Sequence, residues 1–210
     1  MREINAPQIA TTARNRVSYL AYRISVEFLL DALNNAMATT HLISGLPCSG
    51  KTTYANGLRA DLDSVAFSLD RWLITSFGQY SIADVGHEEH VRRVLGSREL
   101  IWDAASELLR RGVDVILDDG FFLRANRMRV VDESRRLGAA AKIHFIDTPL
   151  SVIRARLEAR NAKLPRYNFR IGQDTLDAFV GLFEVPTDDE GANLVVIRDF
   201  GFIRTESSDV

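Results

Sequence analysis

The sequence contains a single cysteine, Cys48, among its 210 residues. One cysteine cannot form an internal disulfide, and it excludes a zinc site built from several cysteines. This composition fits a reducing compartment, so we expect a cytoplasmic protein. Long hydrophobic runs are also absent, because charged residues interrupt every apolar stretch well short of the roughly 18 residues that a membrane span requires. We therefore expect no membrane segment.

A strong charge of either sign is missing too, since the formal net charge is −2. No global basic field favours binding to DNA or RNA. The N-terminal residues lack a signal-peptide layout, because no apolar run follows Arg2 before Arg14. With 46% hydrophobic and 26% charged residues, the composition is that of an ordinary globular protein of about one domain.

Short apolar runs alternate with helical patterns from about residue 39 onward. The runs are His41–Ser44, Val65–Leu69, Val113–Leu117, Ala141–Ile146 and Leu194–Ile197, and the helical patterns lie near residues 51–61, 87–111, 124–137, 149–161 and 174–183. Continuous apolar runs joined by helices indicate parallel strands that are buried on both faces. The sequence therefore predicts a three-layer α/β domain with about five mostly parallel strands, which binds ligands at the carboxyl ends of the strands.

The N-terminal segment stands apart from this pattern. Apolar residues at Val17, Leu20, Ile24 and Phe28 are spaced three or four apart, which predicts an amphipathic helix over residues 14–35. Because the first strand follows shortly after Met37, residues 1–36 are either an additional helix or an upstream extension from a wrongly chosen start codon. We expect the main domain to comprise residues 37–210.

The segment from Gly45 to Thr52 matches the pattern G-x-x-x-x-G-K-[ST] in full. Glycines let the backbone amides approach a phosphate closely, and the helix that follows directs its N-terminal dipole at the anion. In this pattern Lys51 reaches the β- and γ-phosphates, and Thr52 binds Mg²⁺. The predicted ATP-binding residues of the loop are Gly45, Leu46, Pro47, Cys48, Ser49, Gly50, Lys51, Thr52 and Thr53.

Carboxylates follow two other predicted strands. Asp70 comes after the second strand, where it could orient an acceptor hydroxyl and take its proton, or instead cap a helix. Asp118 and Asp119 follow the third strand, where one carboxylate could hold the hydrated Mg²⁺ and where an Asp-Gly turn is the alternative. Asp118 continues directly from the strand, and strand alternation lets only one of the pair face the P-loop. We therefore favour Asp118 over Asp119.

Residues 154–170 carry six basic side chains against the single acid Glu158, a local charge of +5. Arginines on a closing lid neutralise the charge that spreads over a phosphoryl group in transfer and exclude water. Arg156 and Arg160, four residues apart, share one helix face. This pattern predicts a short lid near residues 160–171, although a solvated basic face is the alternative.

Several of these segments together resemble small P-loop kinases of the polynucleotide kinase, chloramphenicol phosphotransferase and zeta-toxin group. The segments are Gly-Leu-Pro-Cys-Ser-Gly-Lys-Thr-Thr, Leu69-Asp70-Arg71, Val115-Ile116-Leu117-Asp118-Asp119-Gly120, Arg156-Leu157-Glu158-Ala159-Arg160-Asn161 and Phe183-Glu184-Val185-Pro186. The resemblance covers about residues 40–198 and implies an adenylate-kinase-like P-loop NTPase fold. It implies that Asp70 is the acceptor-side base, that Arg156 stacks on adenine, and that Arg160 contacts phosphate. Cys48 departs from the glycine or alanine common in such loops.

These observations predict a kinase that moves the γ-phosphate of Mg·ATP to a hydroxyl of a small molecule, a nucleotide or a nucleic-acid end. A sugar nucleotide is a further possible acceptor, by resemblance to zeta toxins. A nucleotide-driven switch without a phosphoacceptor is the main alternative class. Arg124 and Arg127 could face a phosphate or solvent, and we expect His87 and His90 to be exposed helix residues rather than zinc ligands.

Overall fold

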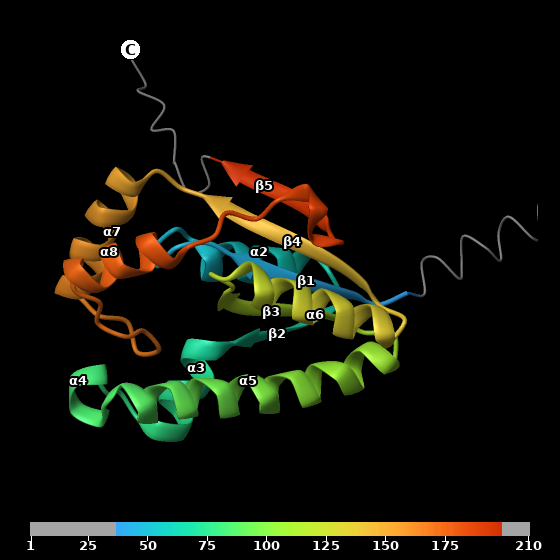
Figure 1. Ribbon diagram of the computed structural model, residues 1–210, viewed down its shortest axis with the longest axis horizontal. Helices are drawn as coiled ribbons and strands as arrows, with labels where there is room; N and C mark the ends of the chain where they lie inside the picture. Colours follow the sequence, from blue (N-terminus) through green and yellow to red (C-terminus); the bar gives the residue numbers. More distant parts are fainter. Residues whose placement is uncertain (1–36, 199–210) are drawn as a thin grey trace, which may run out of the picture. The chain divides into compact units, whose positions relative to one another are not determined.

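The computed structural model describes residues 37–198, which form a five-stranded sheet with helices on both faces (Figure 1). The strand order is β2-β3-β1-β4-β5, and every neighbouring pair is parallel. The strands are β1 (Thr39–Ser44), β2 (Ser64–Ser68), β3 (Asp114–Gly120), β4 (Ala140–Asp147) and β5 (Asn193–Arg198). The predicted α/β P-loop fold is confirmed. The carboxyl ends of β1 and β3 lie side by side, and the candidate site residues lie there.

The helices form the two outer layers. They are α2 (Lys51–Asp61), α3 (Leu69–Phe77), α4 (Ile82–Val85), α5 (His87–Arg110), α6 (Arg124–Arg136), α7 (Leu150–Ala162) and α8 (Gln173–Leu182), with the short 3-10 helix η1 (Asp188–Glu190) before β5. Side chains of α3, α5 and α6 pack together with one face of the sheet, and α2 packs on the opposite face. Helices α7 and α8 form a separate small core around Ile153, Leu157 and Leu176.

Adjacent residues of the central strands supply both hydrophobic cores. Leu42 packs on the α5 side and Ile43 on the α2 side, and Val115 and Ile116 of β3 divide in the same way. All four side chains are fully buried, and such burial contributes about 1.5–3 kcal/mol for each. This two-sided burial explains why the strands read as continuous apolar runs rather than as alternating ones.

Two local predictions need correction. The second strand ends at Ser68, so Leu69 and Asp70 belong to the first turn of α3 instead of closing the strand. The short helix α4 was not predicted; it begins at a capping box formed by Ser81 and Asp84.

The helix predicted over residues 14–35 lies outside the described residues. Within residues 37–198, none of the helices has the length and apolar character needed to cross a membrane.

Candidate active site

The loop from Gly45 to Thr52 connects β1 to α2 and has the backbone of a phosphate cradle. Gly45 has a φ of 149°, and a Cβ added there would lie 3.0 Å from the carbonyl oxygen of Ile146. Gly50, with φ 108°, is the N-cap of α2 and provides no side-chain cap for the helix. The first amides of α2 are therefore left to bind an anion.

Contacts from three sides hold this loop in shape. The Lys51 ammonium donates to the Leu46 carbonyl at 2.8 Å. The Ser49 carbonyl accepts from the Thr148 hydroxyl at 2.8 Å and from the Arg156 guanidinium at 3.1 Å. Burial lowers the pKa of Lys51, while the carboxylates of Asp118 and Asp70 oppose that shift. Lys51 is thus the cation between the loop and the two carboxylates.

Asp118 and Asp119 face different partners. The Thr52 hydroxyl donates to Asp118 at 2.7 Å, while Arg98 of α5 donates to both carboxylate oxygens of Asp119 at 2.7 and 2.8 Å. Burial raises the pKa of Asp119, although Arg98 counteracts this. Only Asp118 therefore reaches the P-loop threonine. A hydroxyl and a carboxylate are oxygen ligands of the kind that Mg²⁺ prefers, so the pair fits the ion that accompanies ATP.

Within residues 37–198, no group of three or more His, Cys, Asp or Glu side chains is arranged to hold a metal ion. A magnesium ion at Thr52 and Asp118 would consequently need further oxygens from phosphate and water, which is how Mg²⁺ usually binds in nucleotide enzymes.

Asp70 lies in the first turn of α3 and lines the same pocket as Lys51 and Asp118. Its surroundings raise its pKa to about 6: burial contributes most, followed among the raising effects by the charge of Asp118, while Lys51 and Arg160 act in the opposite direction. The alternative role as helix cap is wrong, because Ser68 occupies the N-cap position. Asp70 remains accessible from the pocket, so it is free to meet a substrate.

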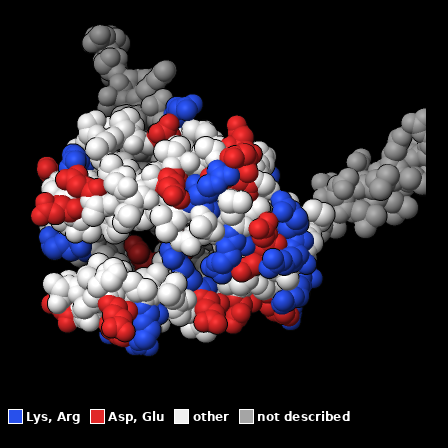
Figure 2. Space-filling view, in the orientation of Figure 1, with Lys and Arg blue, Asp and Glu red and all other residues white. Residues whose placement is uncertain are grey.

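One large cavity joins these groups. Its volume is about 940 Å³, and its walls come from the P-loop, α3, α4, α5, the end of β3, α7 and the chain leading into α8. In the space-filling view a hollow opens at one side of the molecule, with an acidic side chain visible inside it (Figure 2). A cavity of this size can hold a nucleotide and a second small molecule together.

The segment predicted to form a lid, near residues 160–171, comprises the end of α7 and the loop that leads to α8. Arg160 donates to the Phe169 carbonyl at 3.3 Å, and its buried Nε has no partner among the described residues. Arg156 and Arg160 both line the cavity, and their roles toward adenine and phosphate stay predictions. Arg154 does not line the cavity, because it pairs with Asp177 on α8. The basic cluster is therefore divided between site and surface.

The lid loop meets the opposite wall of the cavity through contacts that no sequence motif announced. Gln79 donates to the Asn168 carbonyl at 3.0 Å, and the rings of Tyr80 and Phe169 meet edge to face at 5.1 Å. His90 is half-buried rather than exposed, and its Nδ1 pairs with the Tyr80 hydroxyl at 3.2 Å. Tyr80, His90 and Phe169 all line the cavity. His87 is exposed as predicted.

Known structures share this fold at low sequence identity. A candidate kinase from Chloroflexus aurantiacus aligns with a TM-score of 0.61 and 16% identity over 77% of this chain and 88% of its own. Kti12 from Chaetomium thermophilum, in complex with ADP-AlF3, aligns with a TM-score of 0.57 and 18% identity over 75% of this chain and 88% of its own. A gluconokinase from Sinorhizobium meliloti aligns with a TM-score of 0.50 and 16% identity over 77% of this chain and 84% of its own. At such identities these likenesses show the fold alone.

No protein of curated function is similar enough in sequence to count as a relative. The profile of the AAA domain family matches residues 41–186 of the 210-residue chain, a span that includes the P-loop, Asp70, Asp118 and the lid. The chain therefore belongs to the AAA domain family, as a P-loop nucleotide-binding protein with the fold of small kinases.

Proposed function

We propose that this protein is an ATP-dependent phosphotransferase that moves the γ-phosphate of Mg·ATP to a hydroxyl of a small molecule. One observation carries the proposal: Lys51 of the phosphate cradle, Asp118 and Asp70 line a single cavity. A nucleotide switch needs the first two groups but has no use for a carboxylate of raised pKa facing them.

The nucleotide half of the reaction rests on the P-loop. The amides between Gly45 and Thr53 would surround the phosphates, and Lys51 would neutralise the β- and γ-phosphates. Thr52 and Asp118 would hold Mg²⁺, which would supply positive charge to neutralise the phosphates. Arg156 would lie toward adenine, and Arg160 would stabilise the charge on the transferring phosphoryl group.

Asp70 would act on the acceptor. Its carboxylate would orient the attacking hydroxyl and take its proton. A pKa of about 6 leaves the group ionised at neutral pH, yet makes it a stronger proton acceptor than an ordinary aspartate at 3.8. A general base works best when its pKa lies near the working pH.

The acceptor wall favours an uncharged small molecule over a nucleic-acid end. Among the cavity residues of α3, α4 and α5, the charged side chains are Asp70 and Arg98, and Arg98 is already paired with Asp119. The remaining groups on this wall include Leu73, Tyr80 and Val94, which offer apolar surface. An acceptor phosphate on this wall would face the Asp70 carboxylate, and Arg98, the arginine that these helices contribute to the cavity, is already paired.

An acceptor screen tests this proposal. Purified protein is given Mg·ATP with members of matched pairs, such as a nucleoside and its monophosphate or a sugar and its phosphate, along with 5′-hydroxyl oligonucleotides. ADP formation is measured against buffer alone and against the Lys51→Ala variant, which identifies contaminating kinases. Formation of ADP that depends on an uncharged hydroxyl compound supports the proposal. Equal ADP formation with buffer alone would favour the nucleotide-driven switch. Phosphorylation of the oligonucleotides would show that the acceptor is a nucleic-acid end and not a small molecule.

A further inference from the structure

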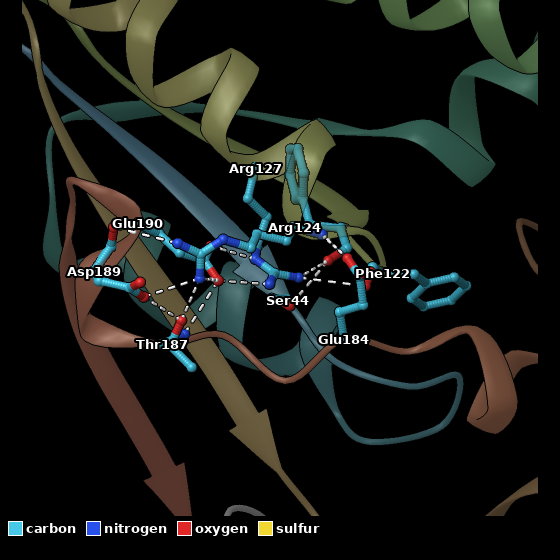
Figure 3. A network of polar contacts seen from close by, with 9 residues as sticks. Ser44, Phe122, Arg124, Arg127, Glu184, Thr187, Asp189 and Glu190 are labelled. Carbon is cyan, nitrogen blue, oxygen red and sulfur yellow. Dashed lines mark hydrogen bonds and ion pairs between the residues drawn. The ribbon is translucent and has the colours of Figure 1, made fainter.

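Arg127 does not occupy either environment expected for it, a phosphate site or solvent. Its side chain is 0% exposed, and as the fourth residue of α6 it lies in a polar network with Phe122 and Glu190 (Figure 3). A buried arginine is costly unless every charge and donor is matched. The partners of Arg127 therefore indicate what it holds in place.

One side of the Arg127 guanidinium forms an ion pair with the Glu190 carboxylate. Its Nε lies 2.6 Å from one carboxylate oxygen and its Nη2 lies 2.7 Å from the other, and the Glu190 side chain is also fully buried. Glu190 in turn accepts from the Thr187 amide at 3.1 Å within the capping box of η1. This bidentate geometry fixes the orientation of the guanidinium plane.

The remaining nitrogen of Arg127 faces the turn that follows β3. Its Nη1 donates to the carbonyls of Phe121 at 2.9 Å and Phe122 at 3.3 Å. Phe121 has a φ of 45°, a left-handed conformation that is unfavourable for a phenylalanine. The two hydrogen bonds from Arg127 help to hold the turn in that conformation.

This turn touches the nucleotide site from two directions. The carbonyl of Gly120 accepts from the amide of Gly45, the first glycine of the P-loop, at 3.0 Å. The Phe122 ring lines the cavity and packs against Phe179 of α8 at 5.1 Å between ring centres. The carbonyl of Phe122 also accepts from the Glu184 amide at 2.9 Å. A shift of the turn would move both the start of the P-loop and one wall of the cavity.

We propose that Arg127 is a positioning residue for nucleotide binding. Oriented by Glu190, its guanidinium fixes the turn of residues 120–122, and through that turn it sets the position of Gly45 and of the Phe122 ring. The inference rests on the proposed nucleotide site but is independent of the acceptor. We call Arg127 and Glu190 together the buried clamp.

The two halves of the buried clamp differ in a way that allows a sharp test. Glu190→Gln breaks the ion pair but leaves the Arg127 bonds to the turn carbonyls. Arg127→Met combined with Glu190→Gln leaves no buried unpaired charge and removes those bonds. Arg136→Met is the control, because Arg136 lies on the same helix and is exposed.

Mg·ATP affinity is measured by calorimetry at a temperature where circular dichroism shows each protein folded, and hydrogen exchange is followed at the Gly45 amide. We expect the double variant to bind Mg·ATP roughly tenfold more weakly, since hydrogen bonds from a charged donor are lost, and to exchange Gly45 faster. Glu190→Gln should lose clearly less affinity than the double variant, because the turn carbonyls keep their donor, and Arg136→Met should stay within about twofold of the parent.

Unchanged affinity and Gly45 exchange in the double variant would overturn the proposal. An equal loss of Mg·ATP affinity in Glu190→Gln and in the double variant would also overturn it. The ion pair would then affect binding through the stability of the fold and not through the turn of residues 120–122. If the double variant does not fold, Arg127→Lys keeps the charge beside Glu190 but lacks the fork of donors. It should show the same faster exchange at Gly45, and parent-like exchange would reject the clamp. A parent protein that does not bind Mg·ATP would instead reject the nucleotide site itself.

Discussion

The nucleotide side and the acceptor side of the cavity are built in different ways. The P-loop side comes from one continuous segment, Gly45 to Thr53, and its main groups are backbone amides. The acceptor side draws single side chains from α3, the region of α4, α5 and the lid loop. A backbone cradle requires glycines at fixed spacing, whereas a side-chain wall allows many residue types at each place. In the proposed reaction the first half would bind the common ligand, ATP, and the second half would set the specificity for the acceptor.

The largest expected effect is at the centre of the backbone cradle. Lys51→Ala should lower phosphotransfer by about 100-fold or more, because it removes the cation that stabilises charge on the phosphates. The fold should persist, since within residues 37–198 the hydrogen bond of the Lys51 side chain is to the Leu46 carbonyl of its own loop. Turnover and circular dichroism are the measurements. Undiminished transfer in a folded variant would remove the P-loop from the mechanism.

Loss of an arginine in the proposed lid should have a smaller effect, and it should lower the rate of transfer rather than the affinity for Mg·ATP. Arg160→Ala should reduce kcat roughly 10–100-fold with little change in Mg·ATP affinity, because the arginine acts mainly on charge developed during transfer. Arg154→Ala is the matched control, since Arg154 lies on the same helix but pairs with Asp177. Equal kcat values for the parent and the Arg160 variant would make the basic cluster a solvated face.

The acceptor side should show effects that spare nucleotide binding. Arg98→Met leaves Asp119 without its bidentate partner. It should destabilise the fold by about 1.5–3 kcal/mol, the usual loss for hydrogen bonds to a charged group. Thermal unfolding and ATP titration check this, with the exposed Arg110→Met on the same helix as control. A tenfold loss of ATP affinity would show that the two sides of the cavity are not separable.

The smallest effect is expected at Cys48. The residue has a φ of 61°, so Cys48→Gly should leave ATP binding unchanged and relieve a mild backbone strain. Burial raises the pKa of the thiol, whereas a position beside a helix N-terminus usually lowers the pKa of a cysteine. Alkylation of Cys48 in the parent should thus be slow at pH 7 compared with a free thiol. Fast alkylation would contradict this placement.

The sequence predicted the parts of the molecule in which chemistry restricts residue choice. The strands were readable because two-sided burial demands continuous apolar runs, and the P-loop was readable because phosphate binding demands Gly45, Gly50, Lys51 and Thr52. Strand alternation favoured Asp118 over Asp119 as the magnesium residue; the Thr52 hydroxyl contacts Asp118, and the metal role itself stays a prediction.

Long-range pairing was beyond the reach of the sequence. Arg127 is 63 residues from Glu190, and Arg98 is 21 residues from Asp119. No local pattern distinguishes such an arginine from one on a solvated helix face. Tyr80 and Phe169 were missed for the same reason, because an aromatic contact between distant loops leaves no periodic signal.

The central claim is that Asp70 is the proton acceptor for the incoming hydroxyl. The direct measurement is kcat against pH with a verified acceptor, for the parent and for Asp70→Asn. In the parent, kcat should fall as the pH drops through about 6, where Asp70 takes up a proton. Asparagine keeps the shape but cannot accept the proton, so Asp70→Asn should be slower by ~10²–10⁴-fold.

Mg·ATP affinity should persist in this variant, because Asp70 is not among the residues of the phosphate cradle. The pKa of Asp70 is higher in the folded protein, at about 6, than the ordinary value of 3.8. Ionisation of Asp70 therefore costs the folded state stability as the pH rises from about 3.8 to about 6, a loss that is complete at pH 7, so the melting temperature of Asp70→Asn at pH 7 should equal or exceed that of the parent. A large, pH-dependent loss of kcat with affinity and melting temperature preserved is the predicted result. An Asp70→Asn protein that transfers phosphate at the parental rate would contradict the account.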